Sequence, residues 1–197
     1  MANKIKYGIK SCYYAPITAF ADTTGAATYG SPVAMPGAVS LSLAAQGEQT
    51  QFYADNIVYW AGDSNSGYQG DLELAKIPDS FKTDILGFIA DGNGVLVEDA
   101  GAESKHFALL FQFEGDEKAT RHVMYNCIAS RPDTASQTKE ASITPVTESI
   151  TITATPVFNV TLNTDIVKAE TNSETQTTAY NSFFTTVYAP TAPSATT

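Results

Sequence analysis

The chain has 197 residues, of which 43% are hydrophobic, 11% aromatic and only 16% charged, and its formal net charge is −10. This length favours a single domain with a substantial hydrophobic core, and this composition excludes an intrinsically disordered chain. The acidic balance argues against nonspecific binding to nucleic acid, which depends on Lys and Arg, and against attraction to an anionic membrane surface.

The first residues and the cysteines indicate the compartment. Residues 2–7 follow Met1 without an apolar stretch, so we expect no secretory signal peptide. No apolar run reaches the roughly 18 residues needed to insert into a membrane. Cys12 and Cys127 each lie in an apolar, strand-like run, and we expect two buried free thiols in a reducing, cytosol-like compartment. A disulfide needs Cα atoms within about 7 Å, which the sequence does not decide.

The first part of the chain is predicted to hold one strand followed by a long segment without regular structure. Residues 3–14 are predicted to form a strand, with alternate apolar residues in phase on one face. Regular structure is then expected to stop, because residues 16–37 are rich in Thr, Ala and Gly and contain three prolines. A structureless segment of this length is unusual in a compact domain. It is either a disordered insertion or a segment that a partner orders, and Phe20 and Tyr29 favour the partner.

A short helix is predicted at about residues 79–88. Asp79 is a suitable N-cap for it, because its carboxylate can accept a hydrogen bond from a free backbone N–H of the first turn. Gly87 weakens the last turn, so the helix should be short. The helix would bury three residues at helical spacing: Phe81, Ile85 and Phe88.

The remaining elements are predicted to be antiparallel strands. They lie at residues 39–44, 49–54, 57–60, 68–77, 95–97, 106–113, 121–130 and 148–157. The first two are expected to pair as a hairpin turned at Gln46-Gly47-Glu48, and Asp63 to Gly67 to form a second turn. The strands at 106–113 and 121–130 are apolar on both faces, which indicates the middle of a sheet covered on each side.

The predicted fold class is therefore mainly β. We expect an antiparallel β-sandwich or barrel-like domain with one short flanking helix. Residues 1–190 are assigned to this single domain, with a long loop at about 16–37, and residues 191–197 to a flexible C-terminal tail. Residues 181–188 are apolar and are predicted to form either a short helix or an edge strand.

No arrangement of residues points to catalysis, to a metal ion or to a cofactor. His106 and His122 are expected far apart along a hairpin, and no Cys or His spacing suits zinc. Residues 63–74 depart from a calcium loop at the glycine and at the twelfth position. Asp71 and Glu73 share one strand face about 7 Å apart, a pair that a glycosidase could use, but outward polar positions on a strand explain them. We predict a protein that is not an enzyme and carries no cofactor.

Four segments in succession carry a resemblance to a known family. They are AQGEQTQFYADNIVYW at 45–60, GYQGDLELAKIPDSFKTDILGF at 67–88, KHFALLFQFEGD at 105–116 and RHVMYNCIASRPDTASQTKEASITPVTESITITATP at 121–156. Together they resemble the major tail proteins of long, flexible-tailed phages, the subunits of the tail tube. The resemblance implies a β-sandwich with a flanking helix, hexameric rings whose inner strands join into one β-barrel, and stacking of the rings into a tube. In that family a long loop and the terminal arms bridge subunits and rings.

The resemblance also implies a function and partners. The chain would be a structural virion protein, assembled in the host bacterial cytoplasm, that forms the tail conduit through which DNA passes without sticking. Its partners would be copies of itself and the tape-measure, tail-terminator and distal tail proteins, with no membrane insertion. Asp71 and Glu73 are candidate lumen-facing acids. Contacts between subunits are expected from six aromatic residues: Tyr13, Tyr14, Phe20, Tyr29, Phe183 and Phe184.

Two alternatives stay open at this point. The particle is a phage, a prophage remnant or a phage-derived bacteriocin. From another class of function, the chain is a carbohydrate- or receptor-binding β-sandwich, in which Trp60 and several of the 10 tyrosines would line a platform for sugars.

Overall fold

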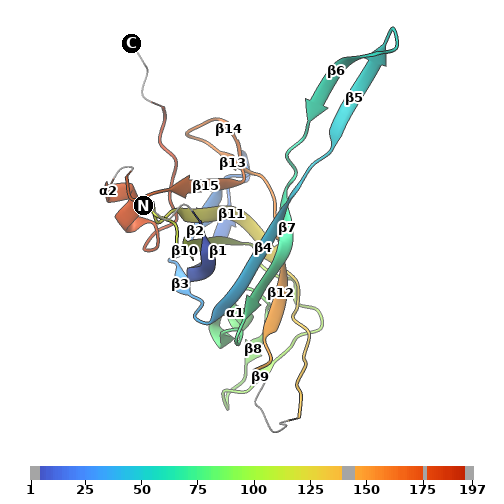
Figure 1. The fold of residues 1–197 in the computed structure, drawn as a ribbon. Coiled ribbons are helices and arrows are strands. Elements are labelled where there is room, and N and C mark those ends of the chain that lie inside the picture. Colours follow the sequence, from blue (N-terminus) through green and yellow to red (C-terminus); the bar gives the residue numbers. More distant parts are fainter. Residues whose placement is uncertain (1–4, 139–144, 175–176, 194–197) are drawn as a thin grey trace.

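The computed structural model describes residues 5–138, 145–174 and 177–193, and most of its elements are antiparallel β-strands (Figure 1). The predicted mainly β fold class is confirmed. The strands are β1 (Tyr7–Phe20), β2 (Ala27–Tyr29), β3 (Val33–Ala34), β4 (Ala38–Gln46), β5 (Gln49–Ala54), β6 (Ile57–Asp63), β7 (Gly67–Leu74), β8 (Ile89–Ala90), β9 (Leu96–Val97), β10 (Phe107–Glu114), β11 (Arg121–Ala129), β12 (Glu148–Ala154), β13 (Val157–Asn159), β14 (Thr164–Ile166) and β15 (Lys168–Thr171). The helices of the described residues are α1 (Asp79–Asp84) and α2 (Thr177–Ser182).

Nine of these strands form one open antiparallel sheet. Its order is β2-β1-β10-β11-β12-β7-β4, with β15 paired to β11 and β3 paired to β1. Three two-stranded ribbons lie outside it: β5-β6, β8-β9 and β13-β14. Because β4 ends this order, one of its edges has no strand partner within the described chain.

Strands β10 and β11 lie in the middle of the sheet with a hydrophobic cluster on each face, as their two-sided apolar sequences predict. Leu109 of β10 packs in the larger cluster, which includes Phe81 of α1, whereas its neighbour Leu110 packs in the second cluster with Tyr125 of β11. Both leucines are fully buried. Successive residues of a strand face opposite sides, so one strand serves both clusters.

Helix α1 covers the larger cluster through one buried side chain, that of Phe81. The Phe81 ring meets the rings of Tyr14 and Phe107 edge-on, at centroid distances of 5.1 and 5.4 Å. Edge-to-face contacts of this kind add to the energy of burial itself. Ile85, immediately after the helix, is also fully buried, and Phe88 is partly buried against the same cluster. The predicted buried stripe therefore holds.

Both ends of α1 differ from the prediction of a helix over 79–88. The helix ends four residues earlier, and the chain then turns at Gly87, whose φ of +78° is a left-handed conformation that favours glycine. At the other end Pro78, not Asp79, is the N-cap, and no side chain caps it. Asp79 lies in the first turn, where its negative charge faces the positive end of the helix dipole.

Residues 16–37 are not the predicted long loop. Strand β1 continues through Pro16, and both β2 and β3 pair with it. The carbonyl of Pro16 accepts a hydrogen bond from the N–H of Gly30 at 2.8 Å, and the next residue, Ile17, donates to His106 at 2.9 Å. These bonds satisfy the backbone around a residue that has no N–H of its own. The residues of this segment favour a loop by their own composition. They become strands because they pair with β1, and composition does not show that pairing.

The hairpin predicted between residues 39–44 and 49–54 is wrong. Strand β4 pairs with β7, and β5 pairs with β6. The connection Gln46-Gly47-Glu48 does not reverse the chain, because it lies opposite Ser64 to Ser66. The N–H of Ser64 donates to the Glu48 carbonyl at 3.1 Å, and that of Ser66 to the Gln46 carbonyl at 2.9 Å.

The chain reverses instead at Asp55-Asn56, whose φ angles of +52° and +63° suit a two-residue hairpin turn. Strands β4 and β7 therefore continue into β5 and β6, which project from the body of the molecule (Figure 1). We call residues 49–63 the arm.

The C-terminal part holds one well-predicted strand and one ambiguous segment. In β12 the apolar residues Ile150, Ile152 and Ala154 alternate with polar residues, and all three are fully buried. Of residues 181–188, α2 takes only the start, and Phe183 beyond it is buried in the second cluster. The predicted tail lies outside the described residues from residue 194 onward. No helix of the described segments is long and apolar enough to cross a membrane.

Candidate assembly surfaces

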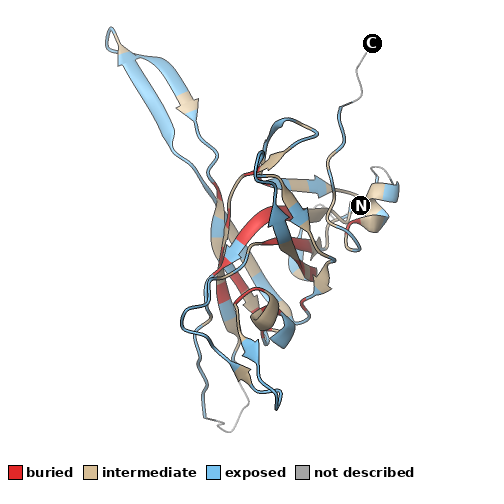
Figure 2. Cartoon of the chain, turned by 180° about the vertical axis from the view of Figure 1, so that it is seen from behind, coloured by how far each residue is buried: buried red, intermediate tan, exposed pale blue. Residues whose placement is uncertain are grey.

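The arm exposes a concentration of large apolar side chains. Phe52 is 59% exposed, Tyr59 72% and Trp60 56%, and Figure 2 shows the arm as an almost wholly exposed ribbon. Its other exposed apolar residues are Tyr53, Ile57 and Val58. A concentration of exposed large apolar side chains marks a site of interaction, and an isolated two-stranded hairpin is only marginally stable in water. The arm is therefore a surface that a second molecule can cover.

The arm is also acidic. Glu48 precedes it, Asp55 lies at its turn and Asp63 ends it, whereas residues 46–67 contain no Lys and no Arg. The arm therefore offers aromatic rings and carboxylates together, and it repels other acidic surfaces of a chain whose net charge is −10.

The second surface is the outer side of the sheet at β4, β7 and β12, opposite the core. We call it the polar face, and its members are Ser40, Ser42, Asp71, Glu73, Ser149 and Thr151. Asp71 lies between Ser42 of β4 and Thr151 of β12, and Thr151 donates a hydrogen bond to its carboxylate at 2.7 Å. The two predicted lumen acids are thus side by side on one polar face.

Hydroxyl groups hold the carboxylate of Glu73 in place. Thr147 donates to one of its oxygens, and Ser40 donates to the other at 2.8 Å. These bonds stabilise the ionised form and lower the pKa of Glu73 below its usual value. The polar face therefore keeps this negative charge at neutral pH.

The six aromatic residues predicted to contact other subunits have different positions. Tyr14 and Phe183 are fully or almost fully buried, at 0% and 1% exposure, and pack inside the chain. As the chain is folded here, neither side chain is available to a second copy. The sequence does not separate buried from exposed aromatic residues when both lie in apolar runs.

The other four predicted contact residues lie nearer the surface. Tyr13 and Phe184 stack on each other with centroids 5.0 Å apart. Phe20 is exposed and meets His106 edge-on at 5.3 Å. Tyr29 is partly buried against Tyr125, and burial raises its pKa.

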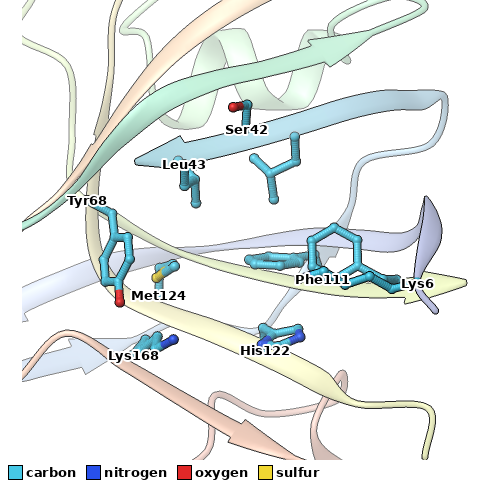
Figure 3. A pocket seen from close by; sticks show the side chains of 10 residues that line it. Lys6, Ser42, Leu43, Tyr68, Phe111, His122, Met124 and Lys168 are labelled. Carbon is cyan, nitrogen blue, oxygen red and sulfur yellow. The ribbon is translucent and has the colours of Figure 1, made fainter. Parts of the chain in front are cut away.

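The third surface is a cavity of about 350 Å³ beside the unpaired edge of β4, which we call the cleft (Figure 3). Figure 3 shows Leu43 of β4 on one side of it and Phe111, His122 and Met124 of β10 and β11 on the other. The lining residues are Lys6, Leu41, Ser42, Leu43, Tyr68, Phe111, Phe113, His122, Met124 and Lys168. Its walls are therefore apolar, aromatic and basic.

Two ammonium groups lie at aromatic rings of the cleft. Lys6 Nζ is 4.8 Å from the ring centroid of Phe113, and Lys168 Nζ is 5.4 Å from that of Tyr68. The four ion pairs among the described residues include neither lysine. His122 Nδ1 lies 3.6 Å from Glu170, but burial, together with the two nearby lysines, lowers its pKa, so the ring is neutral at neutral pH.

The other histidine, His106, and the two cysteines lie apart from the cleft. His106 contacts the side-chain oxygen of Asn126 through Nδ1 at 2.6 Å, on a different part of the sheet from His122. Cys12 and Cys127 are buried free thiols, as predicted, and burial raises the pKa of each to about 12. No group of three or more potential metal ligands occurs among the residues that the structure describes.

Sequence reasoning missed both the arm and the cleft. The Asp55-Asn56 dipeptide was the available signal for the arm, because Asp and Asn tolerate the left-handed conformations that this turn requires. The cleft has no local signal. Its residues are spread along the sequence from Lys6 to Lys168 and meet only in the folded sheet.

An exposed apolar arm, a polar sheet face and an open cleft are surfaces for contact, and together they define a β-rich structural protein that associates with other proteins. The comparison with protein families gives the particular class. The family model described as phage tail tube protein matches residues 2–192. The chain belongs to this family, and it is a structural component of a virion tail. A search of curated proteins found no match.

Proposed function

We propose that the chain polymerises into rings, six subunits to a ring, which stack into the tail tube through which DNA passes into the host. Family membership supports a tube subunit, and one observation of this chain carries the proposal further. The arm exposes its large apolar residues and projects from the body, so it reaches beyond the surface of its own subunit. A second copy in an adjacent ring is the occupant that we propose for it.

The polar face supports a conduit for DNA. Its serines, threonines and the acids Asp71 and Glu73 carry no cationic group among them, and cationic groups are what bind phosphates. We propose that this face lines the lumen. A lining of carboxylates and hydroxyls repels the DNA backbone weakly and evenly, so the DNA slides without being held.

The contacts between neighbouring subunits are proposed from the exposure of the six aromatic residues. We propose that Tyr13, Phe20, Tyr29 and Phe184 take part in contacts between neighbouring subunits, while Tyr14 and Phe183 act only in the core. The ends of the tube would meet the tape-measure, tail-terminator and distal tail proteins. Assembly would take place in the host bacterial cytoplasm.

The test of this proposal is assembly of the purified chain, followed by negative-stain microscopy. We expect rings or tubes for the wild type and monomers for a Tyr59→Ser, Trp60→Ser variant. Thermal unfolding of that monomer should be unchanged, because both side chains are exposed and support little of the fold. Val160→Ser is the matched control, since Val160 is 61% exposed but lies outside the arm.

Two results would count against the proposal. Assembly of the arm variant at wild-type concentration would remove the arm from the contacts between copies. Discrete wild-type monomers with measurable affinity for glycans would favour the carbohydrate-binding alternative, for which Tyr59 and Trp60 would form the sugar platform.

A further inference from the structure

The far end of the arm and the cleft of the same chain lie too far apart to meet. Residue Tyr68, in the wall of the cleft, follows directly after the base of the arm, whereas the arm's turn at Asp55-Asn56 is at its far end. Six residues of β-strand span about 20 Å. Figure 1 shows the arm pointing away from the body. A contact between the far end of the arm and the cleft therefore joins two copies.

The two surfaces are complementary in charge. The cleft presents Lys6 and Lys168, neither of which takes part in an ion pair among the described residues. The arm presents Asp55 and Asp63, neither of which belongs to an ion pair of the described residues, and residues 46–67 contain no Lys and no Arg. In a chain of net charge −10, most other surfaces would repel these carboxylates.

The two surfaces are also complementary in their apolar character. The cleft has a volume of about 350 Å³, within the roughly 300–1,000 Å³ of pockets that hold small ligands, so it accepts an aromatic side chain. Its Met124 thioether packs favourably on aromatic rings. The Lys6 and Lys168 ammonium groups already lie at ring faces, and an indole is the ring that binds a cation best.

We infer that the cleft is the receptor for the arm of a second copy, with an aromatic side chain of the arm in the cleft and one carboxylate of the arm, Asp55 or Asp63, on Lys6 or Lys168. This inference rests on the proposed assembly of the chain and names the site that each arm occupies. Charge complementarity at such a contact fixes the partner and the orientation of docking more than it adds affinity.

The first test is zero-length cross-linking of assembled wild-type protein with a carbodiimide, which joins a lysine amine to a carboxylate only where the two are in contact. Mixing isotopically light and heavy chains before assembly identifies links between copies. We expect linked peptides that join Asp55 or Asp63 to Lys6 or Lys168 across light and heavy chains. Links from the arm to other lysines, such as Lys10 or Lys76, would overturn the inference.

The second test is charge reversal. Lys6→Glu with Lys168→Glu should raise the concentration needed for assembly by at least about tenfold, and adding Asp55→Lys with Asp63→Lys should restore it. The matched control is Lys76→Glu with Lys105→Glu. Each Lys→Glu change alters the net charge by −2, so each double variant goes from −10 to −14. All four lysines are exposed.

The outcomes separate this inference from the proposed function. If the wild type and the control assemble and the cleft variant does not, with rescue by the arm variant, both stand. If the cleft variant assembles like the control, the inference is overturned and the tube subunit remains. If the wild type forms no rings or tubes under any condition, the proposed function fails and the inference fails with it.

Discussion

Ile85 contributes more to stability than its place just beyond a short helix indicates. Its side chain is fully buried in the larger cluster, so we expect Ile85→Ala to lower the free energy of unfolding by about 2–5 kcal/mol. Lys82→Ala, three residues earlier and inside helix α1, is the comparison. Lys82 makes only a long 3.5 Å contact with Asp79, and its loss should cost less than about 1 kcal/mol. Urea unfolding of the monomers measures both values, and equal losses would mean that the helix packs through another face.

At the scale of single residues, the sequence predicts burial well where apolar and polar residues alternate along a strand, and poorly where apolar residues are adjacent. Ile150 and Ile152 alternate with polar residues, a pattern that predicts burial of both, and both are fully buried. Tyr13 and Tyr14 are adjacent in an apolar run, so the pattern does not show which of them faces inward. The structure buries Tyr14 against Phe81 and leaves Tyr13 on the second cluster, stacked on Phe184.

At the scale of elements, the turn between β10 and β11 depends on one carboxylate. Asp116 accepts hydrogen bonds from the N–H groups of Lys118 at 3.1 Å and Thr120 at 2.9 Å. The bonds from Thr120 are the main cause of the lowered pKa of Asp116. A lowered pKa means that the folded chain binds its proton less readily than the unfolded chain. The stabilisation is therefore present above the unfolded pKa and is lost as pH falls through the folded value.

We therefore expect Asp116→Asn to be less stable than the wild type at pH 7 and to match it increasingly as pH falls below about 4. The two oxygens of the Asp116 carboxylate accept one N–H group each, and the amide keeps only one acceptor oxygen, so it resembles the protonated acid in shape and in acceptors. Urea midpoints at pH 7 and pH 3 measure the difference. Glu117→Gln makes the same charge change at an exposed neighbour and should show a smaller effect. A difference for Asp116→Asn that stays constant with pH would contradict this account.

The elements that the sequence predicts are those whose signal is local. Strands β10, β11 and β12 and helix α1 were predicted because their own residues carry the pattern. The pairing of β4 with β7 was missed, since Gly47 with polar neighbours gives the same local signal as a turn, and only Ser64 opposite it decides that the chain runs straight on. The pairing of β2 and β3 with β1 was also missed, because local composition favours a loop there and only the partner strand decides otherwise. One wall of the cleft comes from β4 and from Tyr68 of β7, so the cleft could not be predicted without the pairing of these two strands.

At the scale of the whole molecule, the net charge of −10 predicts how the chain meets DNA. Affinity for a duplex comes mainly from cations that displace counterions, and it is strongest at low salt. We expect no gel shift of duplex DNA by the monomer, even at the lowest salt tested. The same result should hold for assembled tubes with Asp71 and Glu73 intact. A shift that weakens as salt rises would contradict a lumen that lets DNA slide.

The same charge governs assembly through two opposed effects of salt. Copies of charge −10 repel one another over distances up to the Debye length, about 30 Å at 0.01 M salt and about 8 Å at 0.15 M. Apolar contacts of the arm and backbone pairing at sheet edges act only at short range. The proposed pair between the arm and Lys6 or Lys168 would be partly buried in the cleft, and partly buried pairs are screened much less than exposed charges.

Repulsion should therefore weaken more than attraction as salt rises. We expect monomers or small oligomers at low salt and neutral pH, and rings or tubes as concentration and ionic strength increase. Lowering the pH toward the pI of about 4.5 should act in the same direction, because protonation removes carboxylate charge. Light scattering across a salt series, with microscopy at both ends, measures this. Tubes that form at low salt and dissolve at high salt would show that exposed ion pairs, not apolar contacts, hold the copies together.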